Sequence, residues 1–216
     1  MTRRLSILVA VALAALLLPA CGGGGEDADE EPQKVEESGD FTRYEVSSAG
    51  FSIAVPKDWR TVSAEEAFTE DELREMKADD PELAPFLDAL EGPDSLVELL
   101  AFDPDVEGDF ATNLNVLVEP VTIDITREQY FEATVSNVRE QLGADVEPER
   151  LELPAGETLH LTYEQSGDAG DSAIATVQYV LFENDTGYGL TYTTLPPRLA
   201  QSSDEFERSA RSFELL

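Results

Sequence analysis

The sequence predicts a single α+β domain over residues 41–216, in which an antiparallel β-sheet is flanked by helices. Strand-like runs follow one another as hairpin neighbours, which favours antiparallel pairing. Helical patterns stand in groups between these runs instead of alternating with single strands, and this arrangement is typical of α+β proteins. The composition, 42% hydrophobic and 8% aromatic residues, is sufficient for one ordinary core.

The first half of this domain combines a hairpin, two helices and a buried strand. Ser63 and Glu66 have the spacing of a capping box, which predicts a helix start directly after Ser63. A run that is apolar on both faces, 96–102, suits a strand covered from both sides. The predicted elements are strands at 41–46, 51–55 and 96–102 and helices at 64–78 and 83–90.

The second half contains most of the predicted sheet. Thr126 and Gln129 form another capping box, and Gly143 ends the helix that follows it. Apolar residues on one stripe of that helix predict its buried face: Phe131, Val135, Val138 and Leu142. A turn at 184–187 predicts a hairpin. The predicted elements are strands at 113–121, 150–153, 158–164, 173–183 and 188–194 and helices at 126–142 and 203–210.

Residues 1–20 have the layout of a lipoprotein signal peptide. Arg3 and Arg4 precede an apolar run that is too short to span a bilayer. Leu18-Pro19-Ala20-Cys21 resembles the lipobox of bacterial lipoproteins, although Pro19 departs from its commonest form. This resemblance implies that Cys21, the single cysteine of the chain, is lipidated and that the mature protein is anchored to the cell membrane outside the cytoplasm. The alternative is a secreted protein with a free thiol at a flexible N-terminus.

Residues 21–40 form a predicted acidic, glycine-rich tether, because they combine Gly22–Gly25 with a block of like charges and show no apolar period. The whole chain has 46 Asp and Glu against 14 Lys and Arg, a net charge of −32. Such a surface repels nucleic acid and anionic lipid headgroups, so we expect neither as a direct partner. Because the acids are spread along the chain, adaptation to salt explains them better than a function does.

A distinctive stretch then suggests a family. Phe51-Ser52-Ile53-Ala54-Val55-Pro56-Lys57-Asp58-Trp59 is a strand that ends at a proline and is followed by a large apolar side chain. It resembles the opening of the PsbP-like superfamily and of LpqN-type lipoproteins of actinobacteria, and Ser212-Phe213 fits the end of the same pattern. The resemblance implies an α-β-α sandwich over 41–216 and a binding or assembly role without catalysis. We expect Trp59 to be buried where the first hairpin meets a helix.

The sequence offers few groups for catalysis or metal binding. His160 is the single histidine, on the strand face opposite Leu159, Leu161 and Tyr163, and neither G-x-S-x-G nor H-E-x-x-H is present. We therefore expect no catalytic residue, cofactor or metal. Asp103–Asp109 matches the first half of an EF-hand loop but has Leu114 where the bidentate Glu belongs, so an acidic hairpin loop is favoured over a calcium site.

These observations predict a non-catalytic cell-envelope lipoprotein, held to the membrane by its N-terminal lipid, that binds a protein or an amphiphile. The alternatives are a carboxylate-dependent cell-wall hydrolase and a calcium-binding structural module. Tyr179, Tyr188 and Tyr192 offer amphipathic contact area on the strands 173–183 and 188–194, which we take as the predicted binding surface. Their other interpretation is that they pack under helices.

Overall fold

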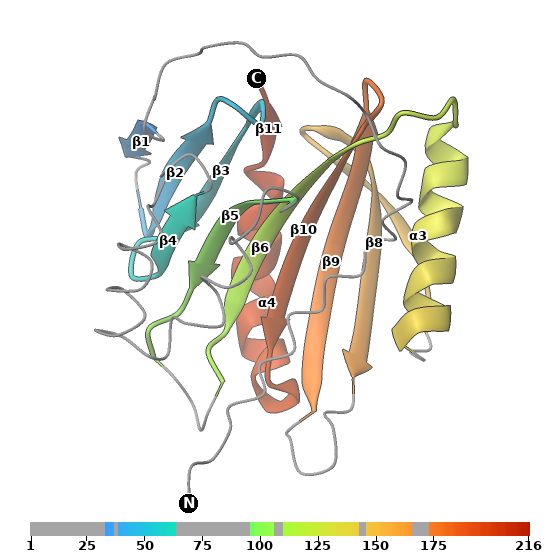
Figure 1. Cartoon of the computed structure of the whole chain (residues 1–216). Coiled ribbons are helices and arrows are strands. Elements are labelled where there is room, and N and C mark those ends of the chain that lie inside the picture. The colour runs from blue at the N-terminus through green and yellow to red at the C-terminus, as the bar shows by residue number, and fades with distance from the viewer. Residues whose placement is uncertain (1–32, 37–38, 64–95, 106–109, 143–145, 166–172) are drawn as a thin grey trace, which may run out of the picture.

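A computed structural model of the chain shows two antiparallel sheets and, among the described residues, two helices (Figure 1). The structure describes residues 33–36, 39–63, 96–105, 110–142, 146–165 and 173–216. The larger sheet has the strand order β4-β5-β6-β10-β9-β8-β7 and the smaller one β1-β2-β3-β11.

The larger sheet consists of β4 (Arg60–Ser63), β5 (Val97–Phe102), β6 (Asn113–Pro120), β7 (Glu149–Leu153), β8 (Gly156–Gln165), β9 (Ile174–Glu183) and β10 (Thr186–Thr194). The smaller sheet consists of β1 (Gln33–Glu36), β2 (Phe41–Val46), β3 (Phe51–Pro56) and β11 (Glu214–Leu215). The helices are α3 (Arg127–Leu142) and α4 (Pro196–Arg211).

One face of the large sheet packs against α4 and the small sheet. Trp59 is 6% exposed and makes an edge contact with Phe206 of α4, with ring centroids 6.5 Å apart. This confirms the predicted burial of Trp59 between the first hairpin and a helix. Phe213, just after α4, stacks on Phe51 at 5.4 Å. Residues near the beginning and near the end of the domain, which are far apart in the sequence, therefore share one core.

Two serines tie the end of α4 to the backbone of β3. Ser209 Oγ donates a hydrogen bond to the Ala54 carbonyl oxygen at 2.7 Å, and Ser212 Oγ accepts one from the Ala54 amide at 2.7 Å. Both backbone groups of Ala54 on this side are thus satisfied by the helix instead of by a further strand. These bonds set the position of α4 along the small sheet.

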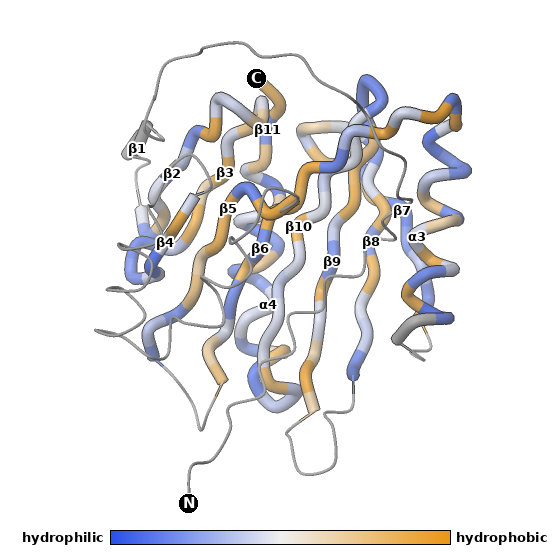
Figure 2. Tube along the Cα trace, viewed as in Figure 1, coloured by the Kyte–Doolittle hydropathy of each residue, from blue (hydrophilic) through white to orange (hydrophobic). Residues whose placement is uncertain are grey.

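The opposite face of the large sheet packs against α3. The predicted capping box is confirmed, because Gln129 Oε1 accepts from the Thr126 amide at 2.9 Å and Thr126 Oγ1 accepts from the Gln129 amide at 3.3 Å. Hydrophobic and hydrophilic residues alternate along the helix (Figure 2). Its buried side chains pack on β8 and β9, and they include Tyr130, Phe131, Val135 and Val138. The predicted α+β architecture with helices on both faces is therefore confirmed.

The structure corrects several predicted boundaries. A strand, β1, lies within the predicted tether of 21–40 and pairs with β2. A second unpredicted strand, β4, pairs with β5 just before the predicted helix start. The last helix begins at Pro196, not at 203, because Pro196 and Pro197 occupy its first positions, where proline loses no helical hydrogen bond.

The hairpin turn between β9 and β10 is also shorter than predicted. Asn184 and Asp185, with φ of 51° and 58°, form the whole loop, while Thr186 already pairs with Glu183. Positive φ at both central residues is typical of the type I′ turn, whose twist suits a two-residue hairpin. Residues 186 and 187 of the predicted turn therefore belong to β10. The signal at 1–20 and the predicted helices at 64–78 and 83–90 lie outside the described residues.

Candidate functional site

The predicted lipidation residue, Cys21, lies outside the described residues, so its role stays a prediction. Within the described ranges, no helix combines the length and hydrophobicity needed to cross a membrane.

His160 is held by neighbours on the sheet. Its Nδ1 lies 3.3 Å from Glu149 Oε2 of the adjacent strand β7, and its ring packs 4.9 Å from the ring of Tyr179. Leu159, Leu161 and Tyr163 lie together on the opposite face of β8, which confirms the predicted alternation, and they pack with the buried residues of α3. The contacts of His160 are those of a sheet residue paired with a carboxylate.

The acidic loop after β5 holds an arginine. Asp103 Oδ1 accepts a hydrogen bond from the Asp105 amide at 2.9 Å, and Asp103 Oδ2 lies 3.5 Å from Arg198 Nη2 of α4. Both carboxylate oxygens of the first residue in the predicted EF-hand pattern are thus occupied by the protein itself. Residues 106–109 of that pattern lie outside the described residues. Among the residues described, no group of three or more His, Cys, Asp or Glu side chains is placed to hold a metal.

The predicted binding tyrosines are not on the surface, so that location is wrong. Tyr179, Tyr188 and Tyr192 are 4%, 9% and 1% exposed and belong to the core between the large sheet and α4. Tyr192 stacks on Phe206 at 4.8 Å. Burial raises the pKa of the Tyr179 hydroxyl to about 12. The alternative interpretation, that they pack under a helix, is the one the structure confirms.

The unexpected feature is a group of polar side chains buried on the other face of the large sheet, which we call the polar band. Its residues are Asn113 and Asn115 of β6, Tyr163 of β8, Thr176 and Gln178 of β9, and Thr191 and Thr193 of β10. Each is exposed by 6% or less. The band lies on the α3 side of the sheet, opposite the core that contains Trp59.

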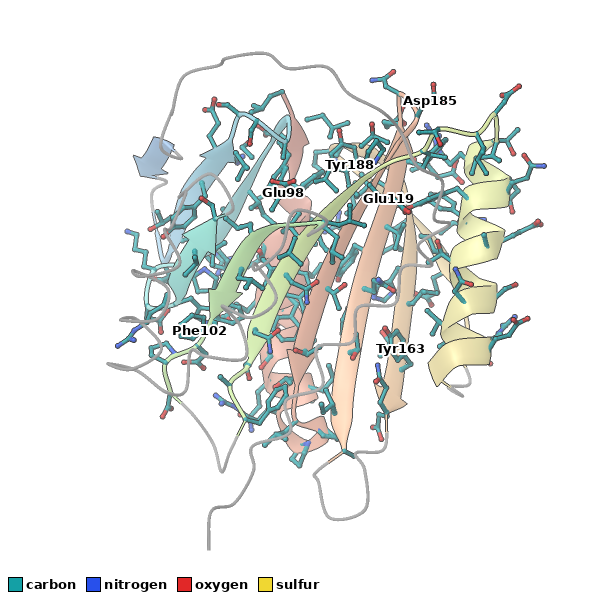
Figure 3. The ribbon with its side chains drawn as sticks, in the orientation of Figure 1. Glu98, Phe102, Glu119, Tyr163, Asp185 and Tyr188 are labelled. Atoms are coloured by element: carbon teal, nitrogen blue, oxygen red, sulfur yellow. The ribbon has the colours of Figure 1, made fainter. Side chains whose placement is uncertain are left out.

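The register arranges the band in two rows that cross the sheet. In the lower row, Asn113, Thr193, Thr176 and Tyr163 are successive cross-strand partners, and Phe102 continues the row on β5. Figure 3 labels Phe102 and Tyr163, the two ends of this row, at the left and at the right of the view.

In the upper row, the corresponding partners are Asn115, Thr191 and Gln178, between Leu100 and Leu161. Directly paired residues of a sheet point to the same face, so the seven side chains share one surface.

Two atoms of the polar band lack partners. Gln178 Nε2 donates to Thr191 Oγ1 at 3.3 Å, but Gln178 Oε1 and Asn115 Oδ1 are buried with no hydrogen bond. The hydroxyls of Thr176 and Tyr163 are neighbours in the register, and a hydrogen bond between them opposes the rise that burial causes in the pKa of Tyr163. Each unpaired amide oxygen costs about 1–3 kcal/mol of stability. Two on one surface indicate that these positions are not optimised for stability alone.

An apolar row borders the band on the side of the β9–β10 turn. Leu159, Val180 and Leu117 are 0–3% exposed. They lie two residues beyond the upper row along β8, β9 and β6. Beyond them, Glu119 accepts a hydrogen bond from the Tyr130 hydroxyl at 3.3 Å. Burial raises the pKa of Glu119, although the Tyr130 hydroxyl opposes this. Glu119 is labelled in Figure 3, well above the lower row.

Tyr130 reaches Glu119 by lying over Gly187 of β10. A Cβ atom at position 187 would overlap the phenol ring and hydroxyl of Tyr130. The sequence suggested a turn role for this glycine, whereas the structure uses it for close approach of a side chain to the sheet. Tyr130 also stacks on Phe182 at 4.8 Å, which fixes the first turn of α3 on β9.

Strand periodicity does not reveal the polar band, because an alternating strand normally has one face in the core and the other in solvent. In β6, Leu114 and Val116 do face the core that contains Trp59, yet Asn113 and Asn115 are buried as well. One signal was available: the outward positions of three neighbouring strands carry Asn, Thr, Gln, Gly and apolar residues, and Glu119 near the end of β6 is the one charged residue among them, in a chain that is 28% charged. An exposed strand face in such a chain would carry charges.

Known structures resemble this fold. Cyanobacterial PsbP (CyanoP) from Synechocystis sp. PCC 6803 is 15% identical over 92% of this chain and 99% of that chain, with a TM-score of 0.50. The chain has a PsbP-like fold. This confirms the architecture that the stretch 51–59 implied, and an identity this low shows the fold alone.

Two further structures are similar at lower scores. LpqN of Mycobacterium tuberculosis, which is involved in cell envelope biogenesis, is 9% identical over 86% of this chain and 90% of that chain, with a TM-score of 0.47. The Ran-binding protein Mog1p of Saccharomyces cerevisiae is 10% identical over 86% of this chain and 96% of that chain, also at 0.47. No protein-family profile and no curated protein sequence matches this chain.

Proposed function

We propose that this protein is a non-catalytic accessory lipoprotein of the cell envelope, in which a PsbP-like domain binds a ligand close to the membrane. The observation that carries the proposal is the polar band, where the side-chain oxygens of Gln178 and Asn115 are buried without hydrogen bonds. Buried polar groups in native proteins have partners, so unpaired groups on one surface call for a ligand or ordered water. The signal and the motif at Leu18–Cys21 support the envelope location.

The geometry favours a small amphiphilic ligand over a protein partner. The aromatic surface expected to contact a protein is buried in the core. The polar band, in contrast, lies beside the apolar row of Leu159, Val180 and Leu117, so polar and apolar contacts adjoin on one surface. Ligand sites are mostly apolar with a few well-placed polar groups, and this surface has that composition.

Catalysis is not supported by the groups described. His160 is paired with Glu149 and packed on Tyr179, an arrangement that holds the ring in the sheet. We expect the full chain in detergent to show no turnover of peptide, ester or glycan substrates. Turnover of one of these that Glu149→Gln abolishes, while Glu152→Gln on the same strand preserves it, would establish a carboxylate-dependent hydrolase and end this proposal.

The membrane anchor is tested separately. We expect Cys21→Ala to leave the protein without its lipid and to move it from the membrane fraction to the soluble fraction, because two acyl chains provide stable anchoring. Fractionation of cells after a high-salt wash measures this. A variant that stays as firmly bound as the wild type would show that another segment attaches the protein.

A further inference from the structure

We propose that the outer edge of β7 is an interface at which two copies of this protein pair, so that their large sheets join into one continuous antiparallel sheet. This inference goes beyond the proposed function and does not depend on the polar band. It follows from the open edge of β7, from the order of its charges and from the position of α3.

β7 is the last strand of the large sheet, and Figure 2 labels it beyond β8, next to α3. Among the strands described, β8 is the one that pairs with it. Glu149, Arg150 and Glu152 are exposed and Leu151 is partly exposed, so the strand is accessible from outside. Alternate residues of an edge strand direct their backbone amide and carbonyl groups away from the sheet, where they can pair with another strand.

The charges of β7 are self-complementary. When two β7 strands pair antiparallel about a two-fold axis at Leu151, Arg150 of each copy lies opposite Glu152 of the other. Glu149 then faces Leu153, and no like charges are opposed. A register moved by two residues, which keeps the same faces together, opposes Arg150 to its own copy or Glu152 to its own copy. Opposite charges across a ladder stabilise it and like charges destabilise it, so β7 favours a single register.

The elements around β7 leave room for the second copy. On the α3 face, the Arg150 guanidinium carbon lies 4.3 Å from the centre of the Phe131 ring, and Arg150 Nη2 lies 2.9 Å from Glu128 Oε1. The helix itself packs over β8 and β9. Three strand spacings, about 14 Å, separate the β8 strands of the two copies, whereas packed helices lie about 8–10 Å apart. The two α3 helices therefore do not overlap. On the other face, Leu151 packs against the core and meets Leu151 of the second copy at the axis.

The charge of the whole chain makes this pairing dependent on salt. Two chains of net charge −32 repel each other over long distances. The Debye length falls from about 10 Å at 0.1 M salt to about 3 Å at 1 M, so salt removes most of this repulsion while the backbone hydrogen bonds of the ladder remain. A strand of five residues is a small interface. A lipid on Cys21 would hold the copies in one membrane and so raise their effective concentration.

Cysteine trapping tests the position of the interface. Cys21 is the single cysteine, so the wild-type chain gives the background. Membranes that contain the full chain are oxidised with copper phenanthroline in 1 M KCl. Leu151→Cys should form a disulfide-linked dimer, because directly opposed residues place their Cβ atoms about 4.5–5.5 Å apart. The control is Thr162→Cys, an exposed position on β8. We expect several-fold more dimer from Leu151→Cys than from this control, and less of it at 0.1 M KCl. Equal trapping at the two positions would overturn the proposal.

Charge exchange in the Leu151→Cys chain tests the register. Arg150→Glu opposes two glutamates and Glu152→Arg opposes two arginines, so each variant alone should give about fivefold less dimer, the effect of losing two exposed charge pairs. Co-expression of the two variants should restore trapping, because every contact then joins opposite charges. The chain with both substitutions keeps the wild-type net charge and should also be trapped.

Melting temperatures show whether each variant folds, since Arg150→Glu also loses the contacts with Phe131 and Glu128. If the variants fold but neither co-expression nor the double exchange restores the dimer, the proposed register is wrong and the proposal fails. If Arg150→Glu does not fold, Glu152→Arg decides alone, and undiminished trapping in that variant would overturn the proposal.

Discussion

Replacing Trp59 by alanine probes the contact that closes the fold. The side chain is 6% exposed and meets Phe206 of α4 edge-on. An aromatic side chain buries about 150–250 Å², worth about 4–6 kcal/mol at about 25 cal/mol per Å². Alanine keeps part of this area and the neighbours relax, so we expect a loss of about 3–5 kcal/mol in the free energy of unfolding. That is a large share of a total stability of about 5–15 kcal/mol.

For a domain of this size, each kcal/mol lowers the melting temperature by about 2–4 °C, so the loss corresponds to about 6–20 °C. Thermal unfolding followed by far-UV circular dichroism measures the shift. The control is Ile123→Ala, because Ile123 is a 47% exposed apolar residue and should change little. If Trp59→Ala melted within a degree or so of that control, Trp59 would not join the hairpin to α4 as described.

Two further predictions concern the region where α3 meets the sheet. Gly187→Ala should destabilise the protein by about 1–3 kcal/mol, because the added methyl group overlaps Tyr130. When Tyr130→Ala is present in the same chain, most of that cost should disappear. Urea unfolding measures both effects, and purely additive losses of stability would refute the close contact. Burial raises the pKa of the Glu119 carboxyl above 4.5. The folded protein therefore keeps the carboxyl proton up to a higher pH than the unfolded chain does. Its stability consequently falls as the pH rises from about 4.5 through the raised pKa. Glu119→Gln should flatten that fall, measured as unfolding midpoint against pH, and an unchanged pH profile would contradict it.

Much of the fold could be predicted from local patterns. The hairpin of β2 and β3 follows from strand periodicity on either side of a small polar turn, and the start of α3 from the Thr126–Gln129 capping box. The stretch ending in Trp59 pointed to the PsbP-like architecture because a strand, a proline and a large anchor stand in fixed order. In these segments local preference and tertiary packing agree, which makes them predictable.

The rest depends on tertiary contacts. The first turns of α4 lack an apolar stripe apart from Leu199, so their helical state follows from Pro196 and Pro197 at its start and from packing further along. The short strand β4 is defined by its pairing with β5. The polar band could not be predicted from periodicity. A strand that is buried on both faces can have the same alternation of polar and apolar residues as a strand with one face in solvent.

Native mass spectrometry of the full chain, released from its own membranes in a polyoxyethylene detergent, tests the central claim most directly. The account predicts a mass above that of the lipidated polypeptide, from a bound small molecule. Thr162→Val, an exposed control on β8, should retain this molecule, and the Asn115→Leu, Gln178→Met double variant, which lacks the two unpaired amide oxygens, should lose it. A wild-type protein that carries only its own mass, or a bound molecule that the double variant holds equally well, would contradict the assignment of the polar band as the ligand site.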